Sequence, residues 1–152
     1  MRSRRNTMKI TIETPSPGEE DEIIVRLASL DERMLKLIYS LRSEQEKLTG
    51  YLEERIVKLK YKDIYYFEAV ENRVFAYTQN GVYEVKKKLY ELEETYAHTD
   101  FLRISKSCIV NVAKIAYLRP TLNGRFEAHL KNQEKIIISR QYVVELKKKL
   151  GI

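Results

Sequence analysis

Residues 64–85 read IYYFEAVENRVFAYTQNGVYEV, and this stretch decides the fold class. Tyrosine, phenylalanine and valine gather in three short segments, and these residue types favour strands over helices. Glu71-Asn72 interrupts the first segment, and Asn80-Gly81 is a dipeptide typical of a tight hairpin turn. The stretch therefore predicts strands over 64–69, 74–78 and 82–85, the last two paired as a hairpin.

Strand signals of the same kind recur on both sides of that stretch. The further predicted strands, rich in apolar and β-branched residues, are 55–60, 115–118, 125–130 and 135–139. Turn residues separate the last three strands, at Asn123-Gly124 and at 131–133. The chain after residue 50 is therefore expected to be rich in β-structure.

Two segments of the same region have helical spacing instead. Residues 88–96 carry Leu89, Leu92 and Tyr96 on one helix face, and residues 141–150 end at Gly151, a residue type common at helix C-caps. The expected fold class is therefore mainly β with short helices, in a domain that covers residues 51–152.

The first 50 residues follow a different pattern. Residues 8–13 alternate apolar and polar side chains and predict a short strand, which the two prolines that follow would end. Ser16 with Glu19 three positions later is a capping-box signature. An amphipathic helix is therefore expected to start there and to end near Gly50.

This predicted helix carries one apolar stripe with spacings of three and four residues. The members of the stripe are Ile23, Leu27, Leu30, Met34, Leu37 and Leu41. Such a stripe suits either an interface between two copies or a helix packed on its own domain. We favour the homodimer, which makes residues 1–50 a dimerisation segment, and keep packing on the domain as the alternative.

Charge is distributed unevenly along the chain, whose formal net charge is +6. The last 52 residues alone hold 11 basic and 3 acidic side chains, a net charge of +8. Neutralisation of phosphates by such side chains releases condensed counterions and supplies most of the non-specific affinity for a nucleic acid. The C-terminal region is therefore expected to bind a polyanion, although a solvated basic surface is the simpler alternative.

Length and composition limit the class of protein. A chain of 152 residues fits one main domain with a short appendage. No apolar run approaches the roughly 20 residues of a spanning helix, and the basic start lacks the apolar segment of a secretion signal. We therefore expect a cytoplasmic protein that is not inserted in a membrane. Met8 is a second candidate start, in which case Arg2, Arg4 and Arg5 precede the native chain.

Side chains for catalysis or metal binding are sparse. His98 and His129 are the only histidines, and neither has a histidine or cysteine partner at metal-ligand spacing. Cys108, the single cysteine, sits in an apolar run and is expected to be a buried structural thiol. Phosphate-loop, dinucleotide and nucleophile-elbow motifs are missing from the sequence. We therefore expect no enzyme, no catalytic residue, no metal and no cofactor.

Four blocks of sequence resemble the LytTR family of bacterial DNA-binding domains, in the order found in that family. They are IYYFEA at 64–69 followed by NR at 72–73, LYELE at 89–93, FLRISKS at 101–107 followed by IVN at 109–111, and ISRQY at 138–142. The resemblance runs from Ile64 nearly to the last residue. It implies an elongated β fold whose loops enter successive major grooves of double-stranded promoter DNA.

The resemblance also implies a set of contact residues. Those implied to read bases are Asn72, Lys106 and Arg140, and those implied to contact the DNA backbone are Arg73, Arg103, Ser107, Ser139 and Gln141. Arginine and lysine can donate to guanine, and asparagine can pair with adenine. Lys106 stands where the family commonly has arginine or asparagine, so its base preference is open. Asn111 matches a family position expected to stabilise a turn.

The leading hypothesis is a sequence-specific transcription regulator that reads repeated half-sites in promoter DNA as a homodimer. The first 50 residues are too short for the receiver domain of many LytTR members. Because no ligand pocket can be read from the sequence, we expect a partner protein or the expression level to control the regulator. Two alternatives stay open. The 11 tyrosines and the basic C-terminal region would also suit an RNA-binding module, and the basic face would suit a protein-interaction module with an acidic partner.

Overall fold

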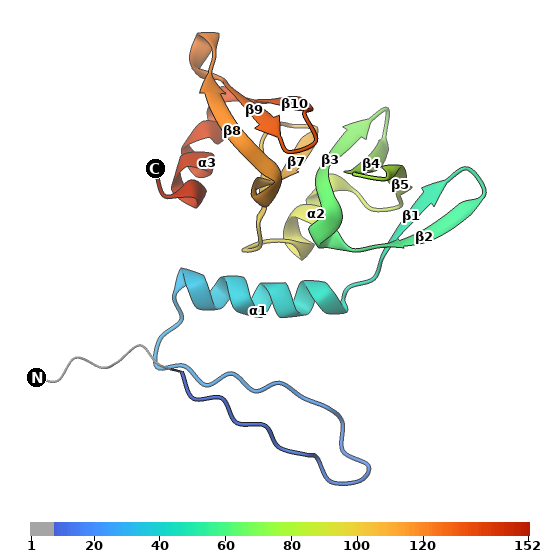
Figure 1. The fold of residues 1–152 in the computed structure, drawn as a ribbon, viewed down its shortest axis with the longest axis vertical. Helices are drawn as coiled ribbons and strands as arrows, with labels where there is room; N and C mark the ends of the chain where they lie inside the picture. The colour runs from blue at the N-terminus through green and yellow to red at the C-terminus, as the bar shows by residue number, and fades with distance from the viewer. Residues whose placement is uncertain (1–7) are drawn as a thin grey trace, which may run out of the picture.

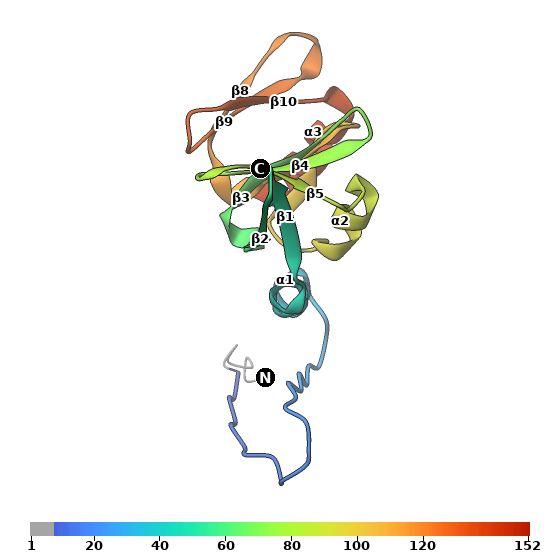
Figure 2. The same ribbon diagram turned by 90° about the vertical axis from the view of Figure 1, so that its right-hand side faces the viewer.

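The structure is a computed structural model, and it describes residues 8–152. The expectation about Arg2, Arg4 and Arg5 lies outside these residues. Within them, ten strands form two antiparallel sheets, joined by short helices (Figures 1 and 2). The predicted mainly β fold with short helices is therefore confirmed.

The larger sheet has seven strands in the order β2-β1-β5-β4-β3-β7-β6. Its strands are β1 (Leu48–Leu52), β2 (Arg55–Leu59), β3 (Ile64–Val70), β4 (Arg73–Thr78), β5 (Gly81–Val85), β6 (Phe101–Arg103) and β7 (Cys108–Asn111). The smaller sheet has the order β10-β9-β8 and comprises β8 (Ile115–Pro120), β9 (Phe126–Leu130) and β10 (Lys135–Ile138).

The α-helices of the described chain are α1 (Glu32–Gln45), α2 (Leu89–Thr95) and α3 (Val143–Leu150). Short 3-10 turns occur at η1 (Tyr61–Asp63), η2 (Val112–Lys114), η3 (Leu122–Gly124) and η4 (Arg140–Tyr142). Both helices predicted after residue 50 are confirmed, as α2 and α3. Gly151 ends α3 with a φ of 72°, as the C-cap prediction required.

Strand β3 lies between two hydrophobic cores. Phe67 belongs to the core that α2 covers, whereas Tyr65 and Tyr66 belong to the core that α3 covers. Consecutive strand residues normally point to opposite faces, but a register shift between Ile64 and Tyr66 allows both tyrosines to enter one core. The run of three aromatic residues therefore serves to join the two halves of the domain.

The predicted hairpin between β4 and β5 is confirmed. Thr78 pairs with Gly81, so the turn residues are Gln79 and Asn80, one position before the predicted Asn80-Gly81 turn, and Gly81 begins β5. Glu71 and Asn72, with φ values of 50° and 63°, form the turn between β3 and β4. Asparagine tolerates this left-handed region better than most residues do, which explains its place at the turn.

The predictions for the N-terminal segment were wrong in part. Residues 8–13 belong to a long loop and form no strand within the described chain. Ser16 and Glu19 form one isolated turn, in which the Glu19 amide donates to the Ser16 carbonyl at 3.0 Å. The helix starts only at Glu32, where the Asp31 side chain accepts from the Met34 amide at 2.9 Å. The intervening run Ile23-Ile24-Val25 is β-branched and opposes helix propagation.

The predicted apolar stripe is consequently divided between two structures. Ile23, Leu27 and Leu30 precede α1 in the long loop, while Met34, Leu37 and Leu41 lie on α1. Met34 is buried, whereas Leu37 is exposed. A continuous helical stripe from Ile23 to Leu41 therefore does not form.

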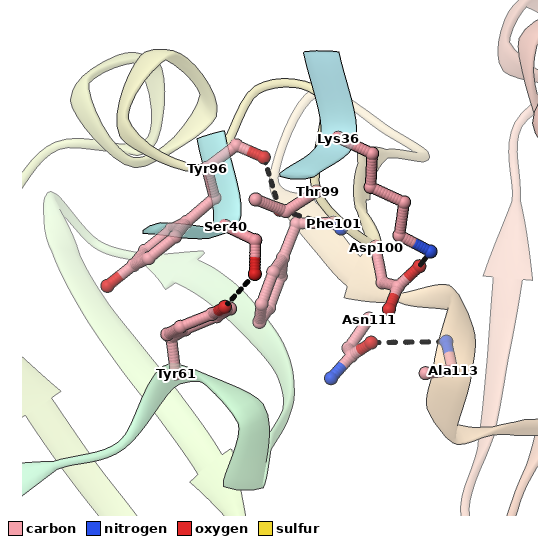
Figure 3. Close-up of polar contacts among 9 residues, drawn as sticks. All are labelled: Lys36, Ser40, Tyr61, Tyr96, Thr99, Asp100, Phe101, Asn111 and Ala113. Carbon is pink, nitrogen blue, oxygen red and sulfur yellow. Dashed lines mark hydrogen bonds and ion pairs between the residues drawn. The ribbon is translucent and has the colours of Figure 1, made fainter. Parts of the chain in front are cut away.

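Helix α1 packs on the domain that follows it (Figure 3). Lys36 forms an ion pair with Asp100 at 2.7 Å, and the hydroxyls of Ser40 and Tyr61 share a hydrogen bond at 3.1 Å. Ser43 is buried and its hydroxyl donates to the Thr95 carbonyl. These contacts support the alternative in which the helix packs on its own domain.

The boundary predicted at residues 50 and 51 falls inside a strand. Gly50 is a residue of β1, which pairs with both β2 and β5. A Cβ at this position would lie 2.7 Å from the Leu59 Cδ1 and 2.8 Å from the Tyr83 Cβ. Gly50 therefore permits a close approach within the sheet and does not end a helix, and strand β1 starts at Leu48.

Candidate nucleic-acid interface

An open groove of about 650 Å³ collects most of the predicted contact residues. Its lining residues, all capable of donating hydrogen bonds through their side chains, are Ser105, Lys106, Ser107, Asn123, Arg125, Ser139, Arg140 and Gln141. Three of them are cations, and the lining contains no carboxylate. Such a surface matches a ligand that offers many acceptor oxygens and negative charge, as the phosphodiester backbone does.

The groove spans the two sheets. Residues 105–107 form the loop between β6 and β7 of the larger sheet. Residues 123–125 belong to the β8–β9 connection, and residues 139–141 follow β10, so both of these segments come from the smaller sheet. The relative position of the two sheets therefore determines the shape of the groove.

Main-chain hydrogen bonds fix that relative position. The Ser139 amide donates to the Ile104 carbonyl at 2.9 Å, which ties the segment after β10 to the base of the β6–β7 loop. The Ile104 amide in turn donates to the Cys108 carbonyl at 3.0 Å and closes the loop at its base. Ile104 and Ile138 are both fully buried, so the residues at the base of these loops are packed in the core.

The β3–β4 turn is tied to the same loop from the other side. The Ala69 amide donates to the Ser107 carbonyl at 2.8 Å, two residues before the turn at Glu71-Asn72. Asn72 and Arg73 are exposed, but neither lines the groove. The predicted base-reading residues thus fall into two places, with Lys106 and Arg140 in the groove and Asn72 on the adjacent turn.

Arg73 already has a partner within the protein. Its guanidinium donates to both carboxylate oxygens of Glu84, at 2.8 and 3.1 Å. Hydrogen bonding to Arg73 is the main cause that lowers the pKa of Glu84 to about 2, and it raises the pKa of Arg73. The Arg73 side chain remains 60% exposed, so one face of it can still reach a phosphate.

Arg103 contacts the groove loop itself. Its Nε donates to the Ser105 carbonyl at 2.7 Å, and one terminal nitrogen donates to the Lys106 carbonyl. The other terminal nitrogen donates to Glu93 of α2 at 2.9 Å. In the described structure Arg103 therefore holds the protein main chain beside Lys106. The sequence analysis expected Arg103 only to contact the DNA backbone.

Arg140 lies across the turn between β8 and β9. A Cβ on Gly124 would be 2.9 Å from the Arg140 Cδ, so the glycine leaves space for the stem of the arginine. Asn123 and Gly124 both have positive φ values, 64° and 73°, and the turn can adopt this shape because of these two residue types. The Asn123-Gly124 signal thus contributes directly to the position of Arg140.

Asn123 and Arg125 are groove residues that the sequence analysis missed. Both were assigned to a turn and to the start of a strand, and no binding role was given to them. Their signal was the presence of a cation next to a turn in the region of highest positive charge. The sequence could not reveal that this turn folds beside Arg140, because the two are 15 residues apart.

Cys108 and Asn111 have structural roles, as expected. Cys108 is buried, and burial raises the pKa of its thiol to about 12. The Asn111 amide donates to the Ile64 carbonyl at 3.0 Å, and its oxygen accepts from the Ala113 amide at 3.1 Å and so caps η2. Asn111 also borders a cavity of about 220 Å³ between α1 and the β domain, where Lys36 and Asp100 form their ion pair.

The tyrosines do not form an exposed stacking platform among residues 8–152. Tyr65, Tyr66 and Tyr96 are buried, and stacked pairs such as Tyr66 with Tyr77 lie within the domain. Single-strand binding through stacking needs exposed aromatic faces next to a basic groove. The groove described above contains no aromatic side chain in its lining. Tyr90 and Tyr117 are exposed but lie outside the groove lining, so the tyrosines supply no stacking surface within this groove.

Comparison with known proteins gives consistent results. The family model of the LytTr DNA-binding domain matches residues 54–151. Uncharacterized HTH-type transcriptional regulators of Staphylococcus aureus strains MSSA476 and NCTC 8325 are each 29% identical over 147 residues, which is 95% of this chain and 99% of each relative. A solved LytTr DNA-binding domain from Bacillus cereus superposes with a TM-score of 0.67 at 23% identity, over 70% of this chain and 99% of that domain.

These matches cover different parts of the chain. The family model corresponds to residues 54–151, whereas the Staphylococcus aureus relatives also extend into the N-terminal 50 residues. The groove is lined by the β6–β7 loop, the β8–β9 connection and the segment between β10 and α3, so the helix–turn–helix label in the names of these relatives does not describe its geometry. No helix within residues 8–152 has the length and apolar character needed to cross a membrane.

Proposed function

The chain belongs to the LytTR family of DNA-binding domains, and we propose that it is a transcription regulator that reads promoter DNA as a homodimer. The observation that carries the proposal is the groove in which Lys106, Arg125 and Arg140 converge with hydroxyl and amide donors. We propose that it acts in the cytoplasm, without enzymatic activity, and that a partner protein or its expression level controls it.

Two kinds of contact are proposed for the groove. Arg140 and Lys106 read base edges in the major groove, where arginine and lysine can donate to guanine O6 and N7. Ser107, Ser139 and Gln141 contact phosphates and fix the register, and Asn123 and Arg125 join this second group. Asn72 reads a base beyond the groove from the β3–β4 turn, and Arg73 contacts a phosphate beside it.

A dimer would read two half-sites separated by about one helical turn of DNA, or by a multiple of it. One module of this size offers a limited contact area, and a second tethered module raises the effective concentration at the neighbouring half-site. The groove therefore supplies the specificity of each half-site, and pairing of two copies supplies the affinity.

Selection from a random pool of duplex DNA tests the proposal. The full chain should enrich one sequence, present twice at a fixed spacing, and binding should weaken steeply as salt rises because phosphates release counterions. Single-stranded RNA, added at equal nucleotide concentration, should fail to displace the selected duplex. Displacement by RNA would favour an RNA-binding module, and a shallow salt dependence with no retained duplex would favour a protein-interaction module.

A further inference from the structure

Residues 8–30, named the N-terminal arm here, project from α1 away from both sheets (Figures 1 and 2). Every residue of the arm is exposed except Leu27, which is half-buried. One main-chain hydrogen bond lies within it, from the Glu19 amide to the Ser16 carbonyl. The arm thus presents its backbone donors and acceptors to solvent along almost its whole length.

The arm is apolar as well as exposed. Ile10 and Ile12 are 86% and 93% exposed, and Ile23 and Ile24 are 66% and 64% exposed. Met8, Val25 and Leu30 are also exposed. Monomeric proteins rarely expose contiguous apolar patches above a few hundred Å² unless the patch binds something. An arm of this composition is therefore expected to be covered by a partner.

The pattern of the arm indicates β-structure in the covered state. Met8, Ile10 and Ile12 alternate with Lys9, Thr11 and Glu13, as in a strand with one apolar face. Residues 23–25 are all β-branched, which favours a second strand in the part of the arm that leads back to α1. A two-stranded hairpin is marginal alone, whereas three or more strands with an apolar face are stable. Strands from a partner would supply the additional strands that a stable sheet needs.

The distribution of charge along the arm indicates which kind of partner it binds. Residues 19–22 are four consecutive carboxylates at the far end of the arm, which phosphates of DNA and anionic lipid headgroups would repel. The root of the arm, which is the part nearest to α1 (residues 8–12 and 24–30), holds Lys9 and Arg26 and no carboxylate. Two arms that run antiparallel place the acidic tip of one beside the basic root of the other. The arm is therefore complementary to a second copy of itself.

We propose that the N-terminal arms of two copies pair as β-structure across a two-fold axis and form the dimer interface of the regulator. The inference identifies the surface that makes the homodimer proposed above, and it replaces the helical stripe. The arm has 23 residues, within the roughly 20–30 residues per side of an interface of about 800 Å² per partner. Because α1 is anchored on its own β domain by Lys36 and Ser40, pairing of the arms would hold the two grooves at a fixed separation.

The primary test is the oligomeric state of the full chain in sedimentation velocity over a concentration series. Wild-type protein should be dimeric, and Ile12→Lys should raise the dimer dissociation constant at least tenfold. Thr11→Lys adds the same charge one residue away, on the polar face, and should change the constant less than threefold. The arm makes no contact with the β-domain cores, so both variants should keep the melting temperature of that domain, measured at a concentration where each is monomeric.

A second measurement reports the structure of the interface. Amide hydrogen exchange should be slow at residues 8–13 and 23–27 in wild-type protein and fast in Ile12→Lys. A monomeric wild-type protein, or a dimer whose arm exchanges freely, would overturn the proposal. So would a dimer that Leu37→Glu dissociates while Ile12→Lys leaves it intact, since that result would place the contact on α1.

DNA binding separates this inference from the proposed function. The Ile12→Lys variant should bind a duplex with one selected half-site as well as wild-type protein does, and should lose the gain in affinity that a second half-site provides. If wild-type protein retains no duplex at all, the DNA-binding proposal fails. The sedimentation result still tests whether the arms form the dimer interface.

Discussion

Gly124 and Arg140 pack directly against each other beside the groove, and the stem of the arginine occupies the space that a side chain at residue 124 would fill. A Cβ on Gly124 would lie 2.9 Å from the Cδ and 3.0 Å from the Cγ of Arg140. Both atoms belong to the stem that carries the guanidinium into the groove. A change at residue 124 should therefore alter DNA reading without removing any donor.

The first prediction concerns that contact. Gly124→Ala should weaken binding to the selected duplex by about tenfold, or ~1.4 kcal/mol, because the stem of Arg140 must move. Gly151→Ala is the matched control, since Gly151 has almost the same φ, 72° against 73°, and no neighbour within 4 Å of its Cβ position. Both variants place an alanine at a left-handed φ of nearly the same value. Equal affinities for the two variants in a fluorescence anisotropy titration would contradict the role of the contact.

The second prediction concerns Arg140 itself. Arg140→Ala should cost about 1–3 kcal/mol of binding free energy on the selected sequence, as the loss of a bidentate base contact does. The loss on random duplex of equal length should be much smaller, and selection with the variant should show relaxed preference at one base pair of each half-site. A loss of the same size on random DNA would reassign Arg140 to the DNA backbone.

The third prediction separates positioning from contact at Arg103. Its guanidinium donates to the Ser105 and Lys106 carbonyls and to Glu93, which a lysine ammonium cannot reproduce in one geometry. Arg103→Lys should therefore weaken DNA binding nearly as much as Arg103→Ala, although it keeps the charge. Faster hydrogen exchange at the Lys106 and Ser107 amides of the free protein should accompany the loss. Full rescue by lysine would indicate a simple phosphate contact.

The fourth prediction concerns Arg125, which lines the groove and carries no assigned base. Arg125→Ala should weaken binding to all duplexes alike, and the slope of log K against log salt should fall by about 0.9, the value for one phosphate contact. Arg119→Ala is the control, because Arg119 pairs with Glu127 at 3.4 Å and lies outside the groove lining. A change in sequence preference for Arg125→Ala would make it a base reader.

Much of the β domain could be predicted from local sequence. The segments that became β3, β4, β5, α2 and α3 were all recognisable, because apolar spacing and turn residues agreed in each of them. Lys106 and Arg140 lie together in the groove, although only family resemblance had paired them. Arg125 could not be found in this way, since its neighbourhood depends on main-chain bonds between distant segments, such as Ser139 to Ile104.

The N-terminal segment shows why its structure could not be predicted correctly from local sequence. The capping signature at Ser16 and Glu19 is real, and its turn forms, but one capped turn cannot propagate through Ile23-Ile24-Val25. The alternation of residues 8–13 predicted a strand, but no strand of the described chain pairs with these residues. Local sequence gives strand character, whereas the partner of a strand is a property of the assembly.

The last prediction concerns pH and the buried thiol. Burial is the main cause that raises the pKa of Cys108 from 9.0 to about 12, so the neutral thiol persists in the folded protein while the unfolded chain ionises. Its contribution to stability is therefore complete below pH 9 and is lost as the pH rises from 9 towards 12. Denaturant unfolding at pH 8 and at pH 10.5 should show a loss that is smaller in Cys108→Ala, which lacks the titrating group. Buried tyrosines such as Tyr96, whose pKa values burial also raises, contribute equally in both proteins, so the difference between the two losses reports Cys108 alone.

Iodoacetamide should alkylate Cys108 at pH 8 only in denaturant. Rapid alkylation of the folded protein would show that the thiol is accessible and that its core is open.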